Sequence, residues 1–475
     1  MRQPPRAPAA SPHAPASRGP RGADRGPARG PDRGADRGAG TGGLTPRWAV
    51  DENTGLDRAV DRVAGQRRAQ ANLLPPTSQR GDPVMAAVLY DALEAASTTD
   101  ALASPYPHGF HSWPAGLHPT IAATVLSGLL PMVPQGGVVD PFAGGGTVGL
   151  EALLHDRPFV GTDLNPLSRM VGTERCRPRS LTQVQAVATV LAGVVERSKD
   201  RVRQKQPSRA PVSPEIARQY APHTLMELAG LLAEIDAIPR DGGPEGIRNT
   251  LAVGFSAILT KVSNRRGDTD GTAGIPRPDG IESDDVGKRV GRFIPTERFE
   301  AKVHELLDKQ QALHDVVGDD ILPVTLVTAD ARDLPGVLGR KKASLILTSP
   351  PYGGTYDYTH HHAHRLAFLG LDAGGDAQSF DRRELFARRR ANPSAFDDET
   401  KQMLASLAEV LHDDGLCVLV VGDAQMGTAR VDAAAHLESL VHAAGLAMVA
   451  VASAPRPDFT GGRDRLEHLV CLRRR

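Results

Sequence analysis

The run Ser349-Pro350-Pro351-Tyr352 follows directly on an apolar segment, residues 343–348. Two prolines cannot continue a central strand, so the run predicts a rigid loop at the carboxyl end of that strand. The exocyclic amine of a nucleobase is a poor nucleophile, because its lone pair is delocalised into the ring. The Pro350 carbonyl and the Ser349 hydroxyl could accept the amine hydrogens and free the lone pair, while the Tyr352 ring could stack on the base. The loop therefore predicts chemistry on such an amine.

A second segment, GGVVDPFAGGGTVGLEALL, predicts a strand, a glycine turn and a helix. Residues 138–139 end the strand, residues 144–146 form the turn, and residues 148–154 have helical character. Residues 159–161 predict the next strand, which brings Asp163 to its carboxyl end, 19 residues after the first glycine of the turn. Glycines that let the backbone approach a ligand, followed by a carboxylate that can bind ribose hydroxyls, suit a nucleoside.

The glycine spacing alone leaves alternatives open. Gly144, Gly146 and Gly149 also satisfy the G-x-G-x-x-G pattern of nicotinamide dinucleotide sites, and a turn that binds nothing is the plainer interpretation. The loop at residues 349–352 argues against both. A dinucleotide-binding or nonenzymatic α/β protein is therefore the remote alternative.

In this order, the motifs resemble those of the S-adenosylmethionine-dependent amino-methyltransferases that modify nucleobases, such as bacterial DNA methylases of cytosine N-4 and adenine N-6. Residues 140–147 are similar to the family's Asp-Pro-Phe-x-Gly-x-Gly-Thr cofactor motif. Residues 111–119 are similar to its His-x-x-Pro-Ala-Lys-Phe-His-Pro element, except that Gly116 and Leu117 replace Lys and Phe. Residues 349–352 match its catalytic motif.

The resemblance implies a role for each matching residue, with S-adenosylmethionine as the cofactor. Asp163 would hold the ribose, and Asp330, which closes a predicted strand over residues 325–328, would meet the adenine amino group. The residues expected to be catalytic are Ser349, Pro350, Pro351 and Tyr352. The other positions expected to bind the cofactor are His118, Pro119, Asp140, Pro141, Phe142, Gly144, Gly146, Thr147 and Asn165.

The resemblance also implies the fold, an α/β Rossmann-like class I methyltransferase domain with a mostly parallel seven-stranded sheet and one antiparallel strand. Residues 415–423 predict a strand that follows a helix over residues 398–412. Residues 446–452 and 467–472 predict two further strands that close the sheet as an antiparallel pair.

The interval between Asp163 and Asp330 is longer than one connecting helix requires. It holds four segments with helical periodicity, residues 181–195, 214–235, 247–262 and 296–316. We therefore expect a mainly helical insertion of about 140 residues.

These observations divide the chain into four parts. Residues 1–82 form a tail rich in Arg, Gly and Pro that we expect to be disordered, since order is expected to begin with a helix near residue 83. Residues 83–175 hold the cofactor motifs, residues 176–320 hold the insertion, a candidate for substrate recognition, and residues 321–475 hold the catalytic motif.

The composition excludes several classes of protein. The 475 residues include 56 basic and 56 acidic side chains and no apolar run long enough for a membrane span or a secretory signal, which favours a cytoplasmic enzyme. The three cysteines, Cys176, Cys417 and Cys471, lie far apart and without CxxC spacing, so we expect them to pack in the core.

The sequence predicts no metal site. Residues 360–364 contain four histidines, but no HExxH or CxxC motif accompanies them, and methyl transfer from a sulfonium needs no metal. A polar wall beside the base pocket is the alternative role for these histidines.

The expected partner is nucleic acid, and DNA is favoured over RNA. In the family, a serine at the first position of the catalytic motif favours cytosine N-4 over adenine N-6. A base in a duplex would have to flip out of the stack to reach the loop. Arg265, Arg266 and the run Arg388–Arg390 could contact phosphates or face solvent. A methyltransferase that modifies tRNA or rRNA bases is the alternative.

Overall fold

The computed structural model describes residues 73–100, 104–113, 116–239, 246–263, 291–351, 358–371, 393–426, 429–456 and 465–475. All of them belong to one unit within residues 51–475. The predicted tail up to residue 72, Tyr352, which was predicted to be catalytic, and the arginines of residues 265–266 and 388–390 lie outside the described residues. None of the helices within the described ranges combines the length and the hydropathy that a membrane crossing requires.

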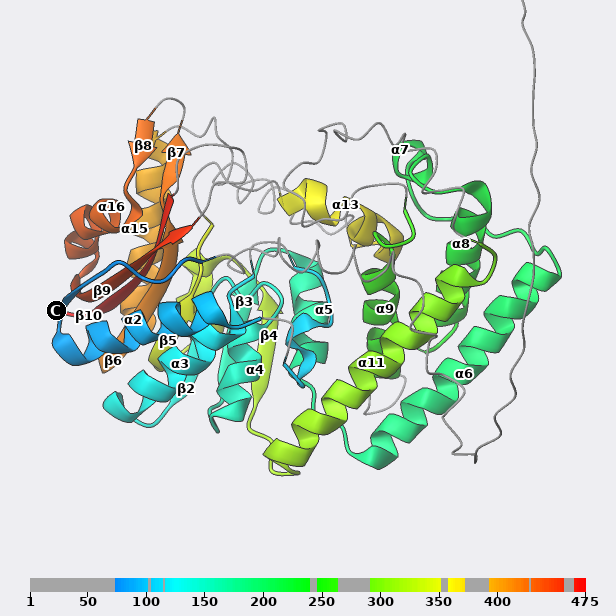
Figure 1. Cartoon of the computed structure of the whole chain (residues 1–475), viewed down its shortest axis with the longest axis horizontal. Helices are drawn as coiled ribbons and strands as arrows, with labels where there is room; N and C mark the ends of the chain where they lie inside the picture. Colours follow the sequence, from blue (N-terminus) through cyan, green and yellow to red (C-terminus); the bar gives the residue numbers. More distant parts are fainter. Residues whose placement is uncertain are drawn as a thin grey trace, which may run out of the picture. The chain divides into compact units, whose positions relative to one another are not determined.

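Eight strands form one mixed sheet in the order β1-β9-β10-β6-β5-β2-β3-β4 (Figure 1). The strands are β1 (Ser78–Gly81), β2 (Gly137–Asp140), β3 (Phe159–Asp163), β4 (Val324–Thr328), β5 (Ala343–Thr348), β6 (Leu411–Gly422), β9 (Leu446–Arg456) and β10 (Arg465–Arg474). Strands β2 to β6 pair in parallel, whereas β10 is antiparallel to both β6 and β9. The predicted Rossmann-like α/β fold with a mostly parallel sheet is confirmed.

One strand of this sheet, β1, goes beyond the seven that were predicted. It precedes the expected start of order and pairs antiparallel with β9 at the sheet edge. All four of its residues are exposed, and its sequence, SQRG, has no apolar periodicity that could reveal a strand. Gly81, with φ +103°, allows the backbone to pass close to Val449, because a Cβ there would lie 2.2 Å from the Val449 carbonyl oxygen.

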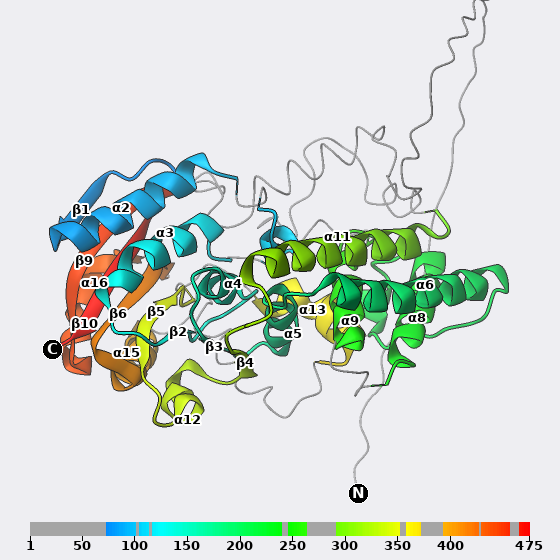
Figure 2. The same cartoon turned by 90° about the horizontal axis from the view of Figure 1, so that it is seen from below.

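Helices cover both faces of the sheet (Figure 2). One face is covered by α2 (Pro83–Thr98), α3 (Pro119–Leu129), α4 (Thr147–Leu154) and α5 (Pro166–Arg175), and the other by α12 (Leu334–Leu338), α15 (Pro393–Val410) and α16 (Ala433–Val441). All six residues of β5 are buried, with Leu345 and Leu347 in one core and Ile346 in the other. Burial on both faces explains why its sequence is a continuous apolar run.

A two-stranded ribbon, β7 (Ala424–Met426) and β8 (Ala429–Val431), follows β6 and was not predicted. The predicted insertion is present as α6 (Leu181–Arg203), α7 (Pro214–Ala217), α8 (Pro222–Asp236), α9 (Ile247–Ile258) and α11 (Ile294–Val317). The segment 214–235 divides into two helices because Pro222 starts α8 at a position where proline is tolerated. These helices share an apolar core with Phe368 of α13 (Tyr358–Leu369).

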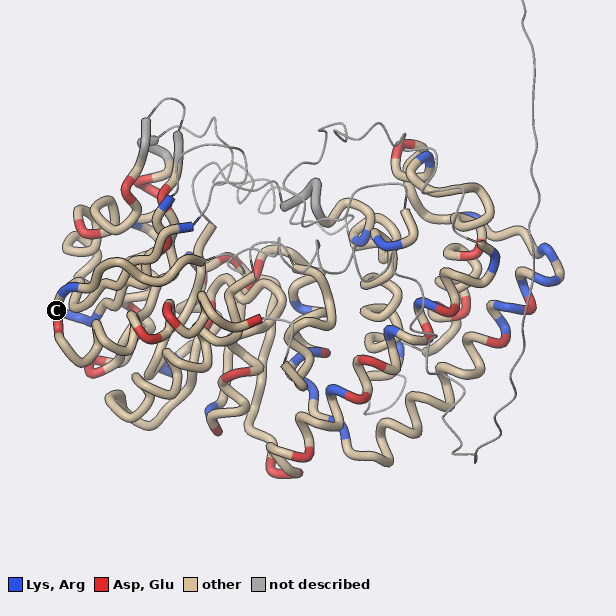
Figure 3. Tube along the Cα trace, viewed as in Figure 1, with Lys and Arg blue, Asp and Glu red and all other residues tan. Residues whose placement is uncertain are grey.

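Charged residues of both signs occur along α11 and in the C-terminal part of α6, residues 196–203 (Figure 3). Two of the arginines in α6, Arg197 and Arg201, both pair with Glu234 of α8, at 2.6 and 2.5 Å. These arginines therefore connect two helices of the insertion rather than forming a free basic stripe.

Candidate functional site

The two motifs that carry the predicted chemistry meet at the carboxyl ends of β2 and β5, which are neighbours in the sheet. The Thr348 hydroxyl donates to Asp140 Oδ1 at 2.5 Å, and the Phe142 N–H donates to the same oxygen at 3.0 Å. Asp140 is buried, and Ser349 and Pro350 continue the chain directly from Thr348. Parallel pairing thus brings together two loops that are distant in the sequence.

The glycine turn is held by Asp163 of the neighbouring strand β3. The Gly144 N–H donates to Asp163 Oδ2 and the Asn165 N–H donates to Asp163 Oδ1, both at 2.9 Å. Gly144 and Gly146 have φ values of +50° and +83°, a backbone conformation that favours glycine. The carboxylate expected to bind ribose therefore also fixes the turn.

Other predicted cofactor-binding residues begin helices near the sheet edge. Asn165 caps α5 by accepting from the Leu167 N–H at 3.0 Å, and His118 caps α3 by accepting from the Thr120 N–H at 3.2 Å. Pro119 and Thr147 are the first residues of α3 and α4. These positions have a local structural role whether or not a cofactor contacts them.

Three further predicted cofactor-binding residues, Pro141, Phe142 and Asp330, each make local contacts at the end of a strand. The Pro141 carbonyl accepts from the Thr162 hydroxyl, and Phe142 packs against the core beneath α12 and α15. Asp330 follows β4, and its two oxygens accept from Arg332 Nε and Nη2 at 2.9 and 2.5 Å. This pairing raises the pKa of the Arg332 guanidinium, so an adenine amino group would have to share the carboxylate with Arg332.

Two buried residues that sequence reasoning did not assign, Trp113 and Arg175, contact the glycine turn. A Cβ on Gly144 would lie 2.8 Å from Trp113 Nε1, and one on Gly145 would lie 2.4 Å from an Arg175 nitrogen. Arg175 donates to the Gly145 carbonyl at 3.0 Å and to the His111 carbonyl at 2.5 Å. Trp113 lies inside the His111–Pro119 segment, so its position in that motif was the available signal.

Two residues of the histidine run, His362 and His364, contact Trp113 or the insertion. The His362 ring lies 4.5 Å from the Trp113 ring, and both side chains are buried. His364 bonds to the Tyr220 hydroxyl at 2.6 Å and to Gln219 Oε1 at 2.8 Å, both in the insertion. The run therefore links the insertion to Trp113, which contacts the glycine turn. The side chains of the first two histidines of the run lie outside the described residues.

An apolar pocket adjoins the loop that follows β5. Residues from α15, α16 and the end of β6 line it together with the loop: Pro350, Pro351, Phe396, Thr400, Met403, Val421, Gly422, Ala424, Val431, Ala433, His436 and Leu437. The Phe396 and His436 rings stack with their centroids 5.5 Å apart, and His436 Nε2 lies 2.6 Å from Asp397 Oδ1. A flat aromatic group could occupy such a pocket next to Pro350.

Burial lowers the pKa of His118 to about 4 from its usual 6.5, which makes stability depend on pH. Below pH 6.5 the unfolded chain takes up a proton at this group, whereas the folded chain does not until about pH 4. Ionisation of His118 therefore does not affect the free energy of unfolding above pH 6.5, and it lowers that free energy as the pH falls from 6.5 toward 4.

We expect the substitution His118→Asn to weaken this dependence, because asparagine does not titrate and can still cap α3. Urea unfolding of the wild type and the variant across this pH range tests the expectation. The free-energy difference between the two proteins should change as the pH falls through the range. A constant difference would contradict the assigned role of His118.

No protein-family model matches the chain. Over 72 residues, the chain is 35% identical to the type II methyltransferase M.MvaI of Kocuria varians, a stretch that covers 15% of this chain and 16% of that protein. The match thus spans about a sixth of the length of this curated relative. Two solved structures align over more of the chain. TrmN from Thermus thermophilus is 12% identical with a TM-score of 0.27, covering 76% of this chain and 49% of that one. The rRNA methyltransferase aviRa from Streptomyces viridochromogenes is 15% identical with a TM-score of 0.26, covering 69% and 83%.

Proposed function

We propose that this protein is an S-adenosylmethionine-dependent methyltransferase that methylates an exocyclic amine of a nucleobase, cytosine N-4 or adenine N-6, in DNA. One observation carries the proposal. The Thr348 hydroxyl bonds to Asp140 at 2.5 Å, so the loop that would bind the amine starts beside the loop that would bind the cofactor. Methyl transfer requires this adjacency, because the reacting nitrogen and carbon must lie about 3–3.5 Å apart and in line.

The residues at the glycine turn fit the proposed cofactor. S-adenosylmethionine supplies a methyl group on a positively charged sulfonium. Asp140 and Asp163 place two buried carboxylates beside the turn, where they favour a cationic ligand with hydroxyl and ammonium groups. The φ values of Gly144 and Gly146 let the backbone turn without a side chain in the way. Trp113 packs on the turn.

Pro350 and Ser349 would orient the amine that receives the methyl group. The Pro350 carbonyl and the Ser349 hydroxyl accept the two amine hydrogens, which turns the nitrogen lone pair toward the methyl group. After transfer, the methylated amine is strongly acidic, and its proton leaves to Ser349 or to water. The apolar pocket next to Pro350 and Pro351 contains the Phe396 ring, and stacking of a base on an aromatic ring stabilises binding by about 1–3 kcal/mol.

DNA is the proposed polymer for two reasons. RNA base methyltransferases with a Pro-Pro-Tyr loop usually have an Asp at its first position, whereas this chain has Ser349, as the DNA cytosine methylases that the sequence resembles do. The 72-residue match to M.MvaI, whose name describes a type II methyltransferase, points in the same direction. A target base inside a duplex would have to flip out, at a cost of a few kcal/mol that stacking and phosphate contacts offset.

Transfer of a labelled methyl group from S-adenosylmethionine to genomic DNA and to total RNA, followed by nucleoside digestion and mass identification, tests the proposal. We expect label in 4-methylcytosine or 6-methyladenine from DNA. The variant Ser349→Ala should lower the transfer rate by about 100-fold, because it removes one of the two acceptors that activate the amine. Ser97 of α2 is partly buried and its hydroxyl donates to the Glu94 carbonyl of the same helix, so Ser97→Ala provides the control variant, which should keep wild-type activity.

The other outcomes separate the alternatives. Label confined to RNA would transfer the assignment to RNA base methylation and overturn the choice of DNA. Binding of S-adenosylmethionine without label in either polymer would overturn the substrate class.

A further inference from the structure

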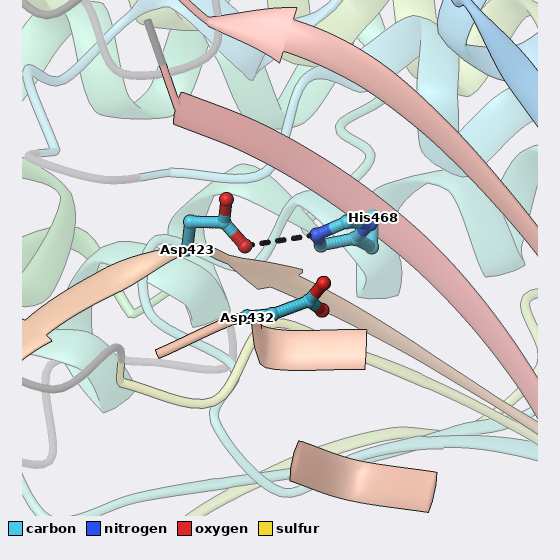
Figure 4. Close-up of side chains that lie close together, drawn as sticks. All are labelled: Asp423, Asp432 and His468. Atoms are coloured by element: carbon cyan, nitrogen blue, oxygen red, sulfur yellow. Dashed lines mark hydrogen bonds and ion pairs between the residues drawn. The ribbon is translucent and has the colours of Figure 1, made fainter. Parts of the chain in front are cut away.

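Three side chains outside the predicted site converge near the apolar pocket. Asp423, Asp432 and His468 each offer one ligand atom, and these atoms lie within 4.8 Å of one another (Figure 4). They come from three elements: Asp423 follows β6, Asp432 precedes α16, and His468 lies in β10. Asp423 and His468 are buried, whereas Asp432 is exposed.

The imidazole of His468 is oriented from both sides. Its Nδ1 lies 2.8 Å from the Ser453 hydroxyl on the neighbouring strand, and its Nε2 lies 3.1 Å from Asp423 Oδ1. With Nδ1 protonated, this atom can donate to Ser453 Oγ, so that Nε2 carries the lone pair that faces Asp423 and Asp432. A hydrogen bond of this kind, on the nitrogen away from the ion, is how metal-binding histidines are usually oriented.

The two aspartates are held by backbone N–H groups. Asp423 Oδ1 accepts from Ala433 at 3.2 Å, and Asp423 Oδ2 accepts from Leu466 at 3.4 Å. Asp432 Oδ1 caps α16 by accepting from Ala435 at 2.9 Å. These bonds fix the positions of the carboxylates but do not cancel their mutual repulsion, which a divalent cation between them would relieve.

We propose that Asp423, Asp432 and His468 form a binding site for a divalent transition-metal ion. One imidazole nitrogen with carboxylate oxygens is a ligand set that suits zinc or manganese, whereas magnesium prefers oxygen ligands alone. Three protein ligands leave further coordination positions for water or for a ligand. The three elements joined by the ion would be β6, α16 and β10.

The site lies beside the apolar pocket, because the chain neighbours of two of its residues line that pocket. Gly422 and Ala424, on either side of Asp423, line the pocket, as do Val431 and Ala433, on either side of Asp432. The ion would therefore lie next to the group that the pocket holds. The metal site itself is independent of the proposed methyl transfer, because no step of that reaction requires it.

Titration of the full-length, chelator-treated protein with zinc, manganese and magnesium chlorides in separate calorimetry experiments tests the site. We expect one zinc or manganese ion to bind per chain and magnesium to bind much more weakly. The variant Asp432→Asn should lower the zinc affinity by about tenfold or more, and asparagine keeps α16 capped, so the fold is preserved. Cobalt titrated in place of zinc should give visible absorption bands that Asp432→Asn weakens.

The exposed pair His314 and Asp319, whose side chains lie 3.0 Å apart, provides the matched control. The variant Asp319→Asn should leave zinc binding unchanged. No zinc or manganese binding by the wild type, or equal affinities for the wild type and Asp432→Asn, would overturn the site. Because these titrations contain neither S-adenosylmethionine nor nucleic acid, their failure is distinct from a failure of the proposed methyl transfer.

Discussion

The substitution Glu174→Gln is expected to destabilise the protein by about 3–5 kcal/mol, because it leaves a buried arginine without its counter-charge. Glu174 is fully buried in α5 and lies 3.6 Å from Arg179, which is 1% exposed. It accepts from the Thr250 hydroxyl at 2.9 Å and from the Asn249 amide at 2.8 Å, both in α9. The amide of Gln310 in α11 donates to the Glu174 carbonyl at 2.7 Å. The carboxylate thus joins the sheet-covering helix α5 to the insertion.

Urea unfolding of the wild type and Glu174→Gln measures this loss. The matched control is Glu438→Gln, which removes a carboxylate from an exposed pair with Arg80, 2.6 Å long. An exposed pair is worth about 0–1 kcal/mol, so the control should unfold at nearly the wild-type urea concentration. Similar losses in the two variants would show that the buried network does not stabilise the junction.

The substitution Asp140→Ala is expected to weaken binding of S-adenosylmethionine by about 100-fold, equivalent to about 2.7 kcal/mol. It removes a buried negative charge from the proposed cofactor site. It also leaves the Thr348 hydroxyl and the Phe142 N–H without their acceptor, at a cost of about 1–3 kcal/mol in stability. Methyl transfer should fall at least as far as binding does, because the two loops lose their connection.

The variant Thr348→Val separates the two roles of Asp140. It removes the hydrogen bond between the loops but keeps the carboxylate, so cofactor affinity should change by less than about tenfold, or 1.4 kcal/mol. Calorimetric titration with S-adenosylmethionine measures both variants. Unchanged affinity in Asp140→Ala would remove Asp140 from the proposed cofactor site.

Much of the sheet could be predicted because its strands are bounded by strong signals. Strand β5 has the predicted bounds, residues 343–348, since an apolar run ends at two prolines. Strand β6 begins at Leu411, earlier than predicted, because the residues before Gly415 continue a helical pattern in the sequence. Strand β1 was missed since its stability comes from backbone pairing with β9, which side-chain types do not reveal.

The candidate site was predictable only where a motif is local. The segments around Asp140 and Ser349 were found by their residue order, and sheet pairing explains why they meet. Trp113 lies inside the His111–Pro119 motif and Arg175 in no motif, but for neither residue does the sequence reveal the contact with the glycine turn, because that contact depends on the tertiary fold. The three residues of the proposed metal site are similarly dispersed, with no spacing that resembles a metal motif.

The position of the insertion has a consequence for the order of folding. Strands β3 and β4 pair in parallel, Asp163 opposite Thr328, although the entire insertion separates them in the chain. Closing so long a loop costs entropy that the few hydrogen bonds of an edge strand must offset. We expect the helices of the insertion to associate first and so bring the two strands within reach. Strand β4 would then join the sheet late, and hydrogen exchange would detect it as a region that opens before the rest of the sheet.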